Sequence, residues 1–157
     1  PEGGLVKRWW WRYWYTPGTS PAPEFSRMPD GSLFQHPQKA LPPDLEHLVQ
    51  SWDLSFKDTS KSDFVAGGVV AAQGADRFVL DLVNERLDIV GSMAAVTAMS
   101  LRHPKARLKY IEDAANGPAL MQMLRGKLAG LIAVSPLGSK EARVSASSPQ
   151  IESGNVW

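Results

Sequence analysis

Two acidic residues stand where apolar strand patterns end, and carboxylates in such places can hold metal ions. Asp53 follows Val49 and Trp52 in "HLVQSWDLSF", and Glu112 closes the run "RLKYIE". Burying an unpaired carboxylate is costly unless a cation or hydrogen-bond donors compensate. If the two strands are parallel neighbours, both acids lie at carboxyl ends, where ligands of open sheets gather. Carboxylate oxygens suit Mg²⁺ or Mn²⁺, and a pair of such ions activates water in phosphodiester cleavage.

The same acids also have a purely structural interpretation. Acids near strand ends commonly cap a turn or a following helix, so Asp53 could instead bind the backbone of its own hairpin. Asp113 is a competing ligand next to Glu112. Side chains alternate along a strand, which places Asp113 on the opposite face and favours Glu112 as the ligand. The residues by themselves leave both interpretations open.

Three groups of basic residues are candidates for contacts with DNA phosphates. Lys57 and Lys61 follow Asp53 in a polar turn, and Lys140 and Arg143 are one helical turn apart. The third group surrounds the start of the fourth predicted strand: Arg102, His103, Lys105, Arg107 and Lys109. Neutralising phosphates gives salt-dependent binding without sequence preference. The net charge is only +1, so nucleic-acid binding must depend on such local groups, and exposed charges are often only solvating.

Hydrophobic periodicity predicts the elements that position these residues. Strands are expected at 47–56, 64–73 and 76–86, with Asp81 on the solvent face of the third. A stripe with helical spacing then predicts a helix at 88–103. The rest of the chain alternates: strand 106–113, helix 116–128, strand 130–136 and a helix from 139 that ends before Gly154. Three antiparallel strands followed by alternating helices and strands predict an α/β fold, a mixed sheet flanked by helices.

Composition divides the chain near residue 44. Eight of the twelve prolines and four of the six tryptophans precede it, and proline at that density opposes helices and interior strands. Residues 1–43 are therefore expected to be an extended arm or interdomain linker, and residues 44–157 a globular domain. The run "VKRWWWRYWY" could stack on single-stranded DNA, but consecutive tryptophans more often pack on a neighbouring domain.

Several classes of protein are disfavoured. The chain has no cysteine, which excludes disulfides and thiol nucleophiles, and its three histidines have no i, i+4 spacing, which disfavours a histidine-rich metal site. No apolar run approaches the roughly 20 residues of a membrane span. No membrane partner is expected.

The run from Asp53 to Val156 resembles the nuclease domain of large terminase subunits from tailed bacteriophages. "WDLSFKDTSKSDFVAGGVV" is similar to that family's first acidic motif, and "KYIEDAANGPAL" to its second. "GSKEARVSASSPQIESGNVW" resembles its Lys/Arg helix and following segment, and "PEGGLVKRWWWRYWY" the stretch that joins its ATPase and nuclease domains. The resemblance implies an RNase H-like fold.

The resemblance also implies a function: the metal-dependent endonuclease of a DNA-packaging terminase, which cuts concatemeric double-stranded DNA by two-metal hydrolysis. Asp53 matches the family's first metal-binding acid and Glu112 its second. The third acid is expected beyond residue 157, and the ATPase motifs, hence ATP, upstream of residue 1. A chain truncated at both ends would cleave weakly or not at all. The implied partners are DNA, an ATPase domain, the portal and the small terminase subunit, in the cytoplasm of the bacterial host.

Two other functions remain open at this stage. A resolvase- or transposase-like enzyme of the same fold would process DNA strands, and a downstream sequence without the expected acids, or no ATPase upstream, would favour it. A non-catalytic RNase H-like module would bind DNA or a portal protein without holding a metal ion. Millimolar Mn²⁺ separates the second possibility from the enzymes, because only the enzymes need an ion near Asp53.

Overall fold

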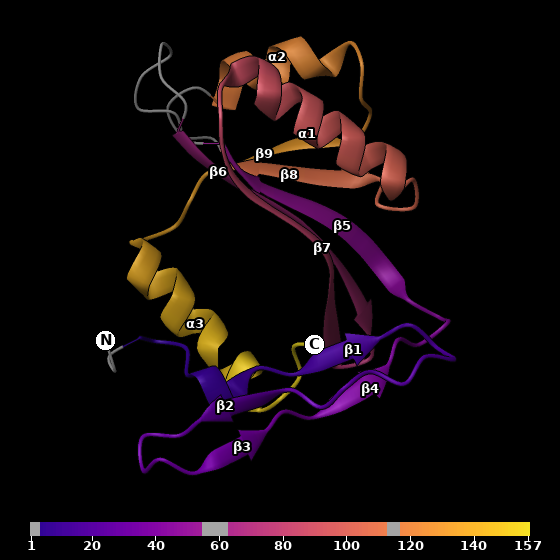
Figure 1. Cartoon of the computed structure of the whole chain (residues 1–157). Helices are drawn as coiled ribbons and strands as arrows, with labels where there is room; N and C mark the ends of the chain where they lie inside the picture. Colours follow the sequence, from indigo (N-terminus) through magenta and orange to yellow (C-terminus); the bar gives the residue numbers. More distant parts are fainter. Residues whose placement is uncertain (1–3, 55–62, 113–116) are drawn as a thin grey trace. The chain divides into compact units, whose positions relative to one another are not determined.

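The elements after residue 45 follow the order predicted from the sequence (Figure 1). The computed structural model describes residues 4–54, 63–112 and 117–157. Its longer elements are β5 (Glu46–Asp53), β6 (Asp63–Gln73), β7 (Asp76–Leu87), α1 (Ile89–Arg102), β8 (Leu108–Glu112), α2 (Gly117–Arg125), β9 (Leu131–Val134) and α3 (Lys140–Glu152). The predicted succession of three strands and then alternating helices and strands is confirmed. None of the described helices is both long and apolar enough to span a bilayer.

Five of these strands form one mixed sheet in the order β7-β6-β5-β8-β9. β8 lies between β5 and β9 and pairs with both in parallel. β6 and β7 are consecutive and joined at Gly74, whose φ of +56° favours glycine in this turn. Because helices follow β7 and β8, the chain can cross over and add parallel strands at one edge. The predicted α/β class is confirmed.

The hydrophobic core lies between this sheet and helices α1 and α2. It includes Trp52 and Ile111 of the sheet, Val96 of α1 and Leu124 of α2, all with no more than 1% exposure. Each such buried side chain contributes about 1.5–3 kcal/mol. Trp52 packs directly against Gly67, where an added Cβ would lie only 2.1 Å from its ring. The Trp52 ring therefore lies directly over the backbone of β6 at Gly67.

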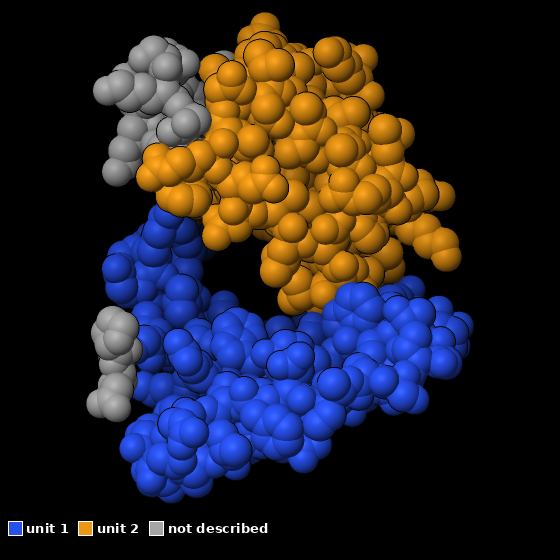
Figure 2. All heavy atoms as spheres, viewed as in Figure 1, with its two compact units in different colours: residues 1–45, 72–78, 137–157 blue, residues 46–71, 79–136 orange. Residues whose placement is uncertain are grey.

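The chain divides into two compact units (Figure 2). Unit 2 comprises residues 46–71 and 79–136 and contains the core just described. Unit 1 comprises residues 1–45, 72–78 and 137–157, so it joins the tip of the β6–β7 hairpin and α3 to the first part of the chain. The division into an arm and a nuclease domain near residue 43 stays a prediction.

The first part of the chain has more regular structure than an extended arm. A short 3-10 helix, Arg8–Trp10, precedes four strands of three residues each: β1 (Tyr13–Tyr15), β2 (Phe25–Arg27), β3 (Leu33–Gln35) and β4 (Gln38–Ala40). β1 pairs with β4 in parallel, and β2 with β3 antiparallel. The prolines fall between the strands, where no ladder hydrogen bond is lost. Proline density thus limited strand length without preventing pairing.

The C-terminal residues complete unit 1. Trp157 donates its backbone N–H to the carbonyl of Arg77 at 2.8 Å, next to the bridge between Arg77 and Val156. Lys39 forms an ion pair with Asp76, and its ammonium lies 4.2 Å from the centroid of the Trp157 ring. Burial raises the pKa of Asp76, but hydrogen bonds from Lys39 and its neighbours outweigh burial, so the pKa falls below its usual value.

Candidate metal centre

The two acids singled out by the sequence lie at the ends of neighbouring parallel strands. Asp53 is the last residue of β5, and Glu112 is the last residue of β8. Trp52 of β5 is paired with Ile111 of β8, so the next residue on each strand is one of the acids. Neighbouring strands lie about 4.8 Å apart. The parallel pairing on which the metal hypothesis depends is therefore present.

Both acids lie on the side of the sheet opposite the core, here called the acid face. Trp52 and Ile111 are buried, and successive side chains of a strand point to opposite faces. Asp53 and Glu112 are half-buried. In such a setting charges interact more strongly than in bulk water, yet solvent and ligands can still reach them. The position suits a pair of carboxylates that share a cation.

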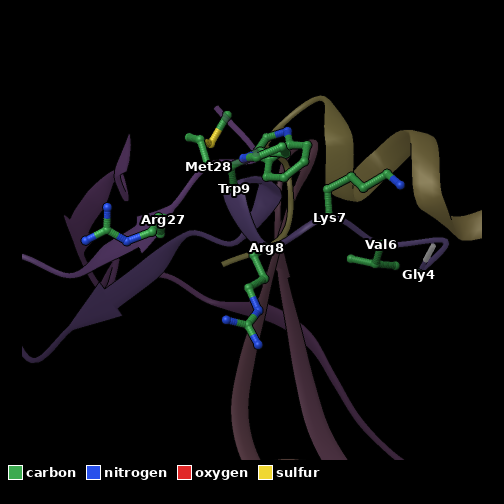
Figure 3. A pocket seen from close by; sticks show the side chains of 8 residues that line it. Gly4, Val6, Lys7, Arg8, Trp9, Arg27 and Met28 are labelled. Carbon is green, nitrogen blue, oxygen red and sulfur yellow. The ribbon is translucent and has the colours of Figure 1, made fainter. Parts of the chain in front are cut away.

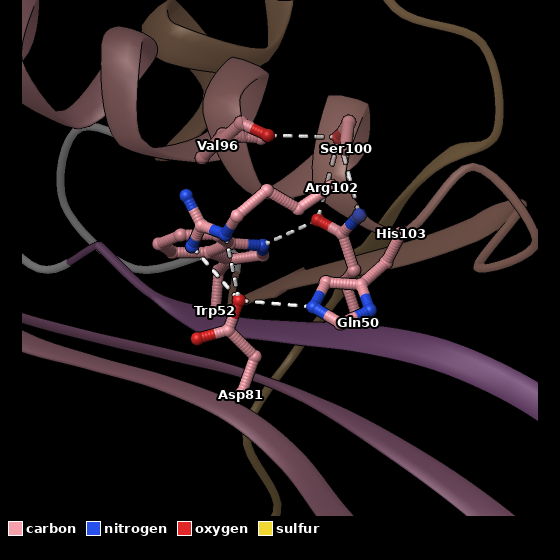
Figure 4. Close-up of polar contacts among 7 residues, drawn as sticks. All are labelled: Gln50, Trp52, Asp81, Val96, Ser100, Arg102 and His103. Atoms are coloured by element: carbon pink, nitrogen blue, oxygen red, sulfur yellow. Dashed lines mark hydrogen bonds and ion pairs between the residues drawn. The ribbon is translucent and has the colours of Figure 1, made fainter.

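A buried polar chain anchors the end of β5 to α1 (Figure 4). The indole N–H of Trp52 donates to Oε1 of Gln50 at 3.0 Å, and the amide of Gln50 donates to Oγ of Ser100 at 3.1 Å. Ser100 in turn donates to the carbonyl of Val96 at 2.8 Å. Gln50 is completely buried, so leaving any of these groups unpaired would be costly. The network fixes the strand that carries Asp53.

A cavity of about 470 Å³ adjoins Asp53. Its lining includes the side chains of Ser51 and Asn84, which are polar, together with apolar groups of β6 and β7. The sequence did not predict this cavity, because its residues come from three strands whose mutual positions no local pattern specifies. It is a space beside Asp53 in which a ligand could be held.

The donors at the site are few. Within the described residues, no group of three or more His, Asp or Glu side chains is placed to hold one ion. Histidines are used elsewhere: Nδ1 of His36 lies 2.7 Å from the carbonyl oxygen of Trp11, and Nε2 lies 2.7 Å from Oγ of Ser26. The predicted competing ligand, Asp113, lies outside the described residues. Two carboxylates thus form the described part of the candidate site.

Two of the four DNA-binding residues predicted outside the start of β8 lie among the residues that the structure describes. Lys57 and Lys61 lie outside the described residues. Lys140 and Arg143 lie in α3, where Ser139 caps the helix by accepting from the N–H of Ala142 at 3.1 Å. Because α3 belongs to unit 1 and the acids belong to unit 2, the roles of these cations stay predictions.

The prediction that Asp81 faces solvent is wrong. Its Oδ2 accepts from Nη2 of Arg102 at 2.8 Å and lies 2.9 Å from Nε2 of His103, so it ties β7 to the end of α1 (Figure 4). Burial raises the pKa of Asp81, but the bonds and charges of Arg102 and His103 outweigh it and lower the pKa. The prediction failed because alternation along a strand does not show which element lies beside each face. Here the end of α1 lies beside β7, and the side chains of Arg102 and His103 pair with the carboxylate of Asp81.

The basic group at the start of β8 is likewise largely structural. Lys109 is buried, and its ammonium donates to the carbonyls of Ala106, Arg107 and Ala129 at 3.1–3.3 Å. Burial lowers the pKa of Lys109. Because Arg102 and His103 are engaged by Asp81, three of the five predicted cations serve the fold, which local charge patterns do not reveal.

A second cavity, of about 460 Å³, lies in unit 1 beside the tryptophan run (Figure 3). Trp9 and Met28 lie together in its wall, while Lys7, Arg8 and Arg27 also line it. The charged ends of these three side chains point in different directions, so they do not converge on one anion. Stacking on DNA and packing on a neighbouring domain both stay predictions for the tryptophan run.

Comparisons with known proteins agree with this arrangement. Residues 50–157, more than half of the chain, match a family model described as the terminase RNaseH-like domain. No curated protein sequence matches the chain. Among solved structures, the large terminase nuclease of thermophilic phage G20c with bound zinc superposes with a TM-score of 0.57 at 17% identity, over 73% of this chain and 64% of that chain.

Two further solved structures are similar. The magnesium-bound form of the same G20c nuclease gives a TM-score of 0.56 at 17% identity, over 73% of this chain and 58% of that chain. The large terminase of a second thermophilic bacteriophage gives 0.56 at 7% identity, over 74% of this chain and 29% of that chain. The chain thus spans less than two thirds of these proteins, and at such low identity the similarity concerns the fold.

Proposed function

Since the chain belongs to the family of terminase RNaseH-like domains, we propose that it is the metal-dependent endonuclease part of a phage DNA-packaging terminase. The observation that carries the proposal is the strand register, which ends β5 and β8 side by side on Asp53 and Glu112. Two carboxylates at adjacent strand ends on a half-buried face repel each other, and a cation shared between them relieves that repulsion.

The donor set fits a hard divalent cation. Asp53 and Glu112 would hold it, because oxygen is the preferred ligand of Mg²⁺ or Mn²⁺. Bound ions of this kind supply a Lewis acid and a water of lowered pKa for phosphodiester hydrolysis. The protein contributes orientation: Trp52 and Gln50 fix the end of β5, and its alternation directs Asp53 to the acid face. Asp113 and an acid beyond residue 157 remain candidates for completing the site.

The proposed substrate is double-stranded DNA, cut from concatemers during packaging. Family membership and the metal-bound G20c nucleases support a phosphodiester substrate and a divalent ion. Lys57, Lys61, Lys140 and Arg143 are proposed to neutralise DNA phosphates. In the complete terminase, an ATPase domain that uses ATP, the portal and the small subunit would be partners, in the host cytoplasm.

Manganese binding tests the metal site directly. Electron paramagnetic resonance of Mn²⁺ titrated with the chain should show binding that Asp53→Asn and Glu112→Gln each weaken by more than about tenfold, since loss of even an outer-shell partner costs about 10–100-fold. Glu46→Gln is the matched control, because Glu46 is an exposed acid at the other end of β5. It should leave the affinity unchanged.

The outcomes separate the candidate functions. If millimolar Mn²⁺ does not bind, or if Glu46→Gln weakens binding as much as Asp53→Asn, the chain is not a nuclease of this kind, and the non-catalytic module is favoured. A plasmid-nicking assay with Mn²⁺ then measures activity. We expect weak nicking at most, because we propose that one acid of the complete site is missing from this chain; strong nicking would show that the acids of this chain suffice.

A further inference from the structure

A DNA strand that reaches the acids needs cations on the same face, since carboxylates repel phosphates. Phosphate contacts from Arg, Lys and uncharged polar side chains also set the position of a protein along DNA. The following inference rests on the proposed function and deepens it by naming residues that hold the substrate. It concerns unit 2 alone, where the acids lie.

The sheet topology brings Arg86 to the same edge as the acids. β5 ends at Asp53; β6 begins at this edge and runs back beside β5, and β7 returns toward it to end at Leu87 (Figure 1). Arg86 is the next-to-last residue of β7 and therefore lies at the strand ends. Only β6 separates β7 from β5.

Arg86 also lies on the acid face. Asp53, Ala66 and Asn84 line one cavity on this face. Residues two apart in a strand share a face, so Arg86 continues the row from Asn84, and Phe64 continues the row from Ala66. The contact between them agrees, since the guanidinium carbon of Arg86 is 4.4 Å from the centroid of the Phe64 ring.

The contact leaves Arg86 well suited to bind an anion. Contact with the Phe64 ring orders the guanidinium. A guanidinium that stacks on an aromatic ring by its flat face keeps its N–H donors available at the edge. The side chain is exposed, and none of the ion pairs among the described residues includes Arg86. An ordered guanidinium that no described acid neutralises can bind a phosphate through two parallel hydrogen bonds. The exposed Phe64 ring (54%) is then explained as its support.

We propose that Arg86, ordered by Phe64, binds a backbone phosphate of the DNA strand that passes over Asp53. Asn84 and Ser51 contact the same strand from the cavity, through uncharged polar groups that suit phosphate and sugar oxygens. The three side chains, two on β7 and one on β5, form a track that leads to the acids.

The test measures binding of a short fluorescent DNA duplex by anisotropy, in EDTA and over a range of NaCl concentrations. Arg86→Ala should weaken binding roughly tenfold and reduce the slope of log K against log salt by about 0.9. Arg86→Lys and Phe64→Leu keep the charge, so they should weaken binding less and preserve the slope. Asn84→Ala should weaken binding without a change in slope.

Arg125→Ala is the matched control, because Arg125 is an exposed cation of α2, which packs on the opposite face. It should leave affinity and slope close to those of the unsubstituted chain. Equal effects of Arg86→Ala and Arg125→Ala would overturn the proposal, as would a failure of the unsubstituted chain to bind duplex at low salt. EDTA removes metal ions, so the result of this assay does not depend on whether the chain binds Mn²⁺. Failure of the Arg86 proposal and failure of the metal proposal are therefore distinguishable. If Arg86→Ala fails to fold, the proposal is tested by the other two variants. Asn84→Ala and Phe64→Leu should each weaken duplex binding without changing the salt slope, and wild-type affinity of both would overturn the proposal.

Discussion

At the scale of single residues, Gly67 connects stability to the candidate site. An ideal Cβ at this position would lie 2.1 Å from Cε3 of Trp52, whose ring is buried and cannot move aside. Asp53 follows Trp52 directly, so any displacement of the indole is passed to the acid through one peptide unit. Glycine usually weakens a strand, but at this position only glycine leaves room for the Trp52 ring against β6.

Gly67→Ala should therefore destabilise the fold by about 1–3 kcal/mol, the usual range for overpacking a core. It should also weaken Mn²⁺ binding, because Asp53 moves with Trp52. Urea unfolding and the Mn²⁺ titration measure the two effects. Gly126→Ala, where an added Cβ would have no neighbour within 4 Å, should have little effect on either. Equal stability of the two variants would mean that Trp52 can shift to accommodate the added Cβ at little cost.

At the scale of elements, two polar connections hold α1 on the sheet. Gln50 joins β5 to Ser100, and Asp81 joins β7 to Arg102 and His103. Both connections bind residues in the last turn of α1 or just after it. They therefore fix the C-terminal end of α1 on the sheet. Apolar packing alone tolerates sliding, whereas directional hydrogen bonds such as these specify one position of the helix on the sheet.

The Asp81 connection should make the free energy of unfolding depend on pH. Its pKa is lowered on folding from 3.8, so its contribution is present above that value and is lost as pH falls through the lower folded value. Asp81→Asn should cost about 1 kcal/mol at pH 7, a value reduced by the exposure of Arg102. Urea unfolding at pH 7 and near pH 2 should show this difference disappearing in acid. Glu85→Gln, an exposed acid of the same strand, should show no such difference; a pH-independent effect of Asp81→Asn would exclude the electrostatic explanation.

At the scale of the whole molecule, the chain builds two units from interleaved segments. Unit 1 takes its members from three separate parts of the sequence, and Trp157 contacts two of them through Arg77 and Lys39. Each unit has its own contacts, so local opening of one need not unfold the other.

Trp157→Ala should selectively loosen unit 1. Hydrogen exchange should become faster at residues 13–15 and 76–78, because the Trp157 ring contacts Lys39, whose strand pairs with β1, and the Trp157 backbone bonds to Arg77. Residues 48–53 and 108–112 of unit 2 should keep their protection. Leu137→Ala is the control, since Leu137 is 84% exposed in the same unit. Faster exchange throughout both units would show instead that the chain unfolds as one body.

The order of strands and helices was predictable because each depends on a short local period, two residues for strands and about 3.6 for helices. The helix predicted at 88–103 is α1, and the strand predicted at 106–113 is β8. The same reasoning misplaced Asp81 and the cations at the start of β8. Their partners are distant in sequence, and a charge pattern does not distinguish a solvated side chain from one that is paired inside the fold.

The sequence by itself determined which residues could do chemistry: a family motif and the end of an apolar strand both single out Asp53 and Glu112, because strand ends and motifs are local features. Only the tertiary structure decided that β5 and β8 are parallel neighbours, in a register that ends both strands on an acid. It alone placed Asn84 and Arg86 on the same face as the acids. Pairing partners and register are set by how the whole sheet buries its apolar side against α1 and α2, and that burial is a property of the folded chain.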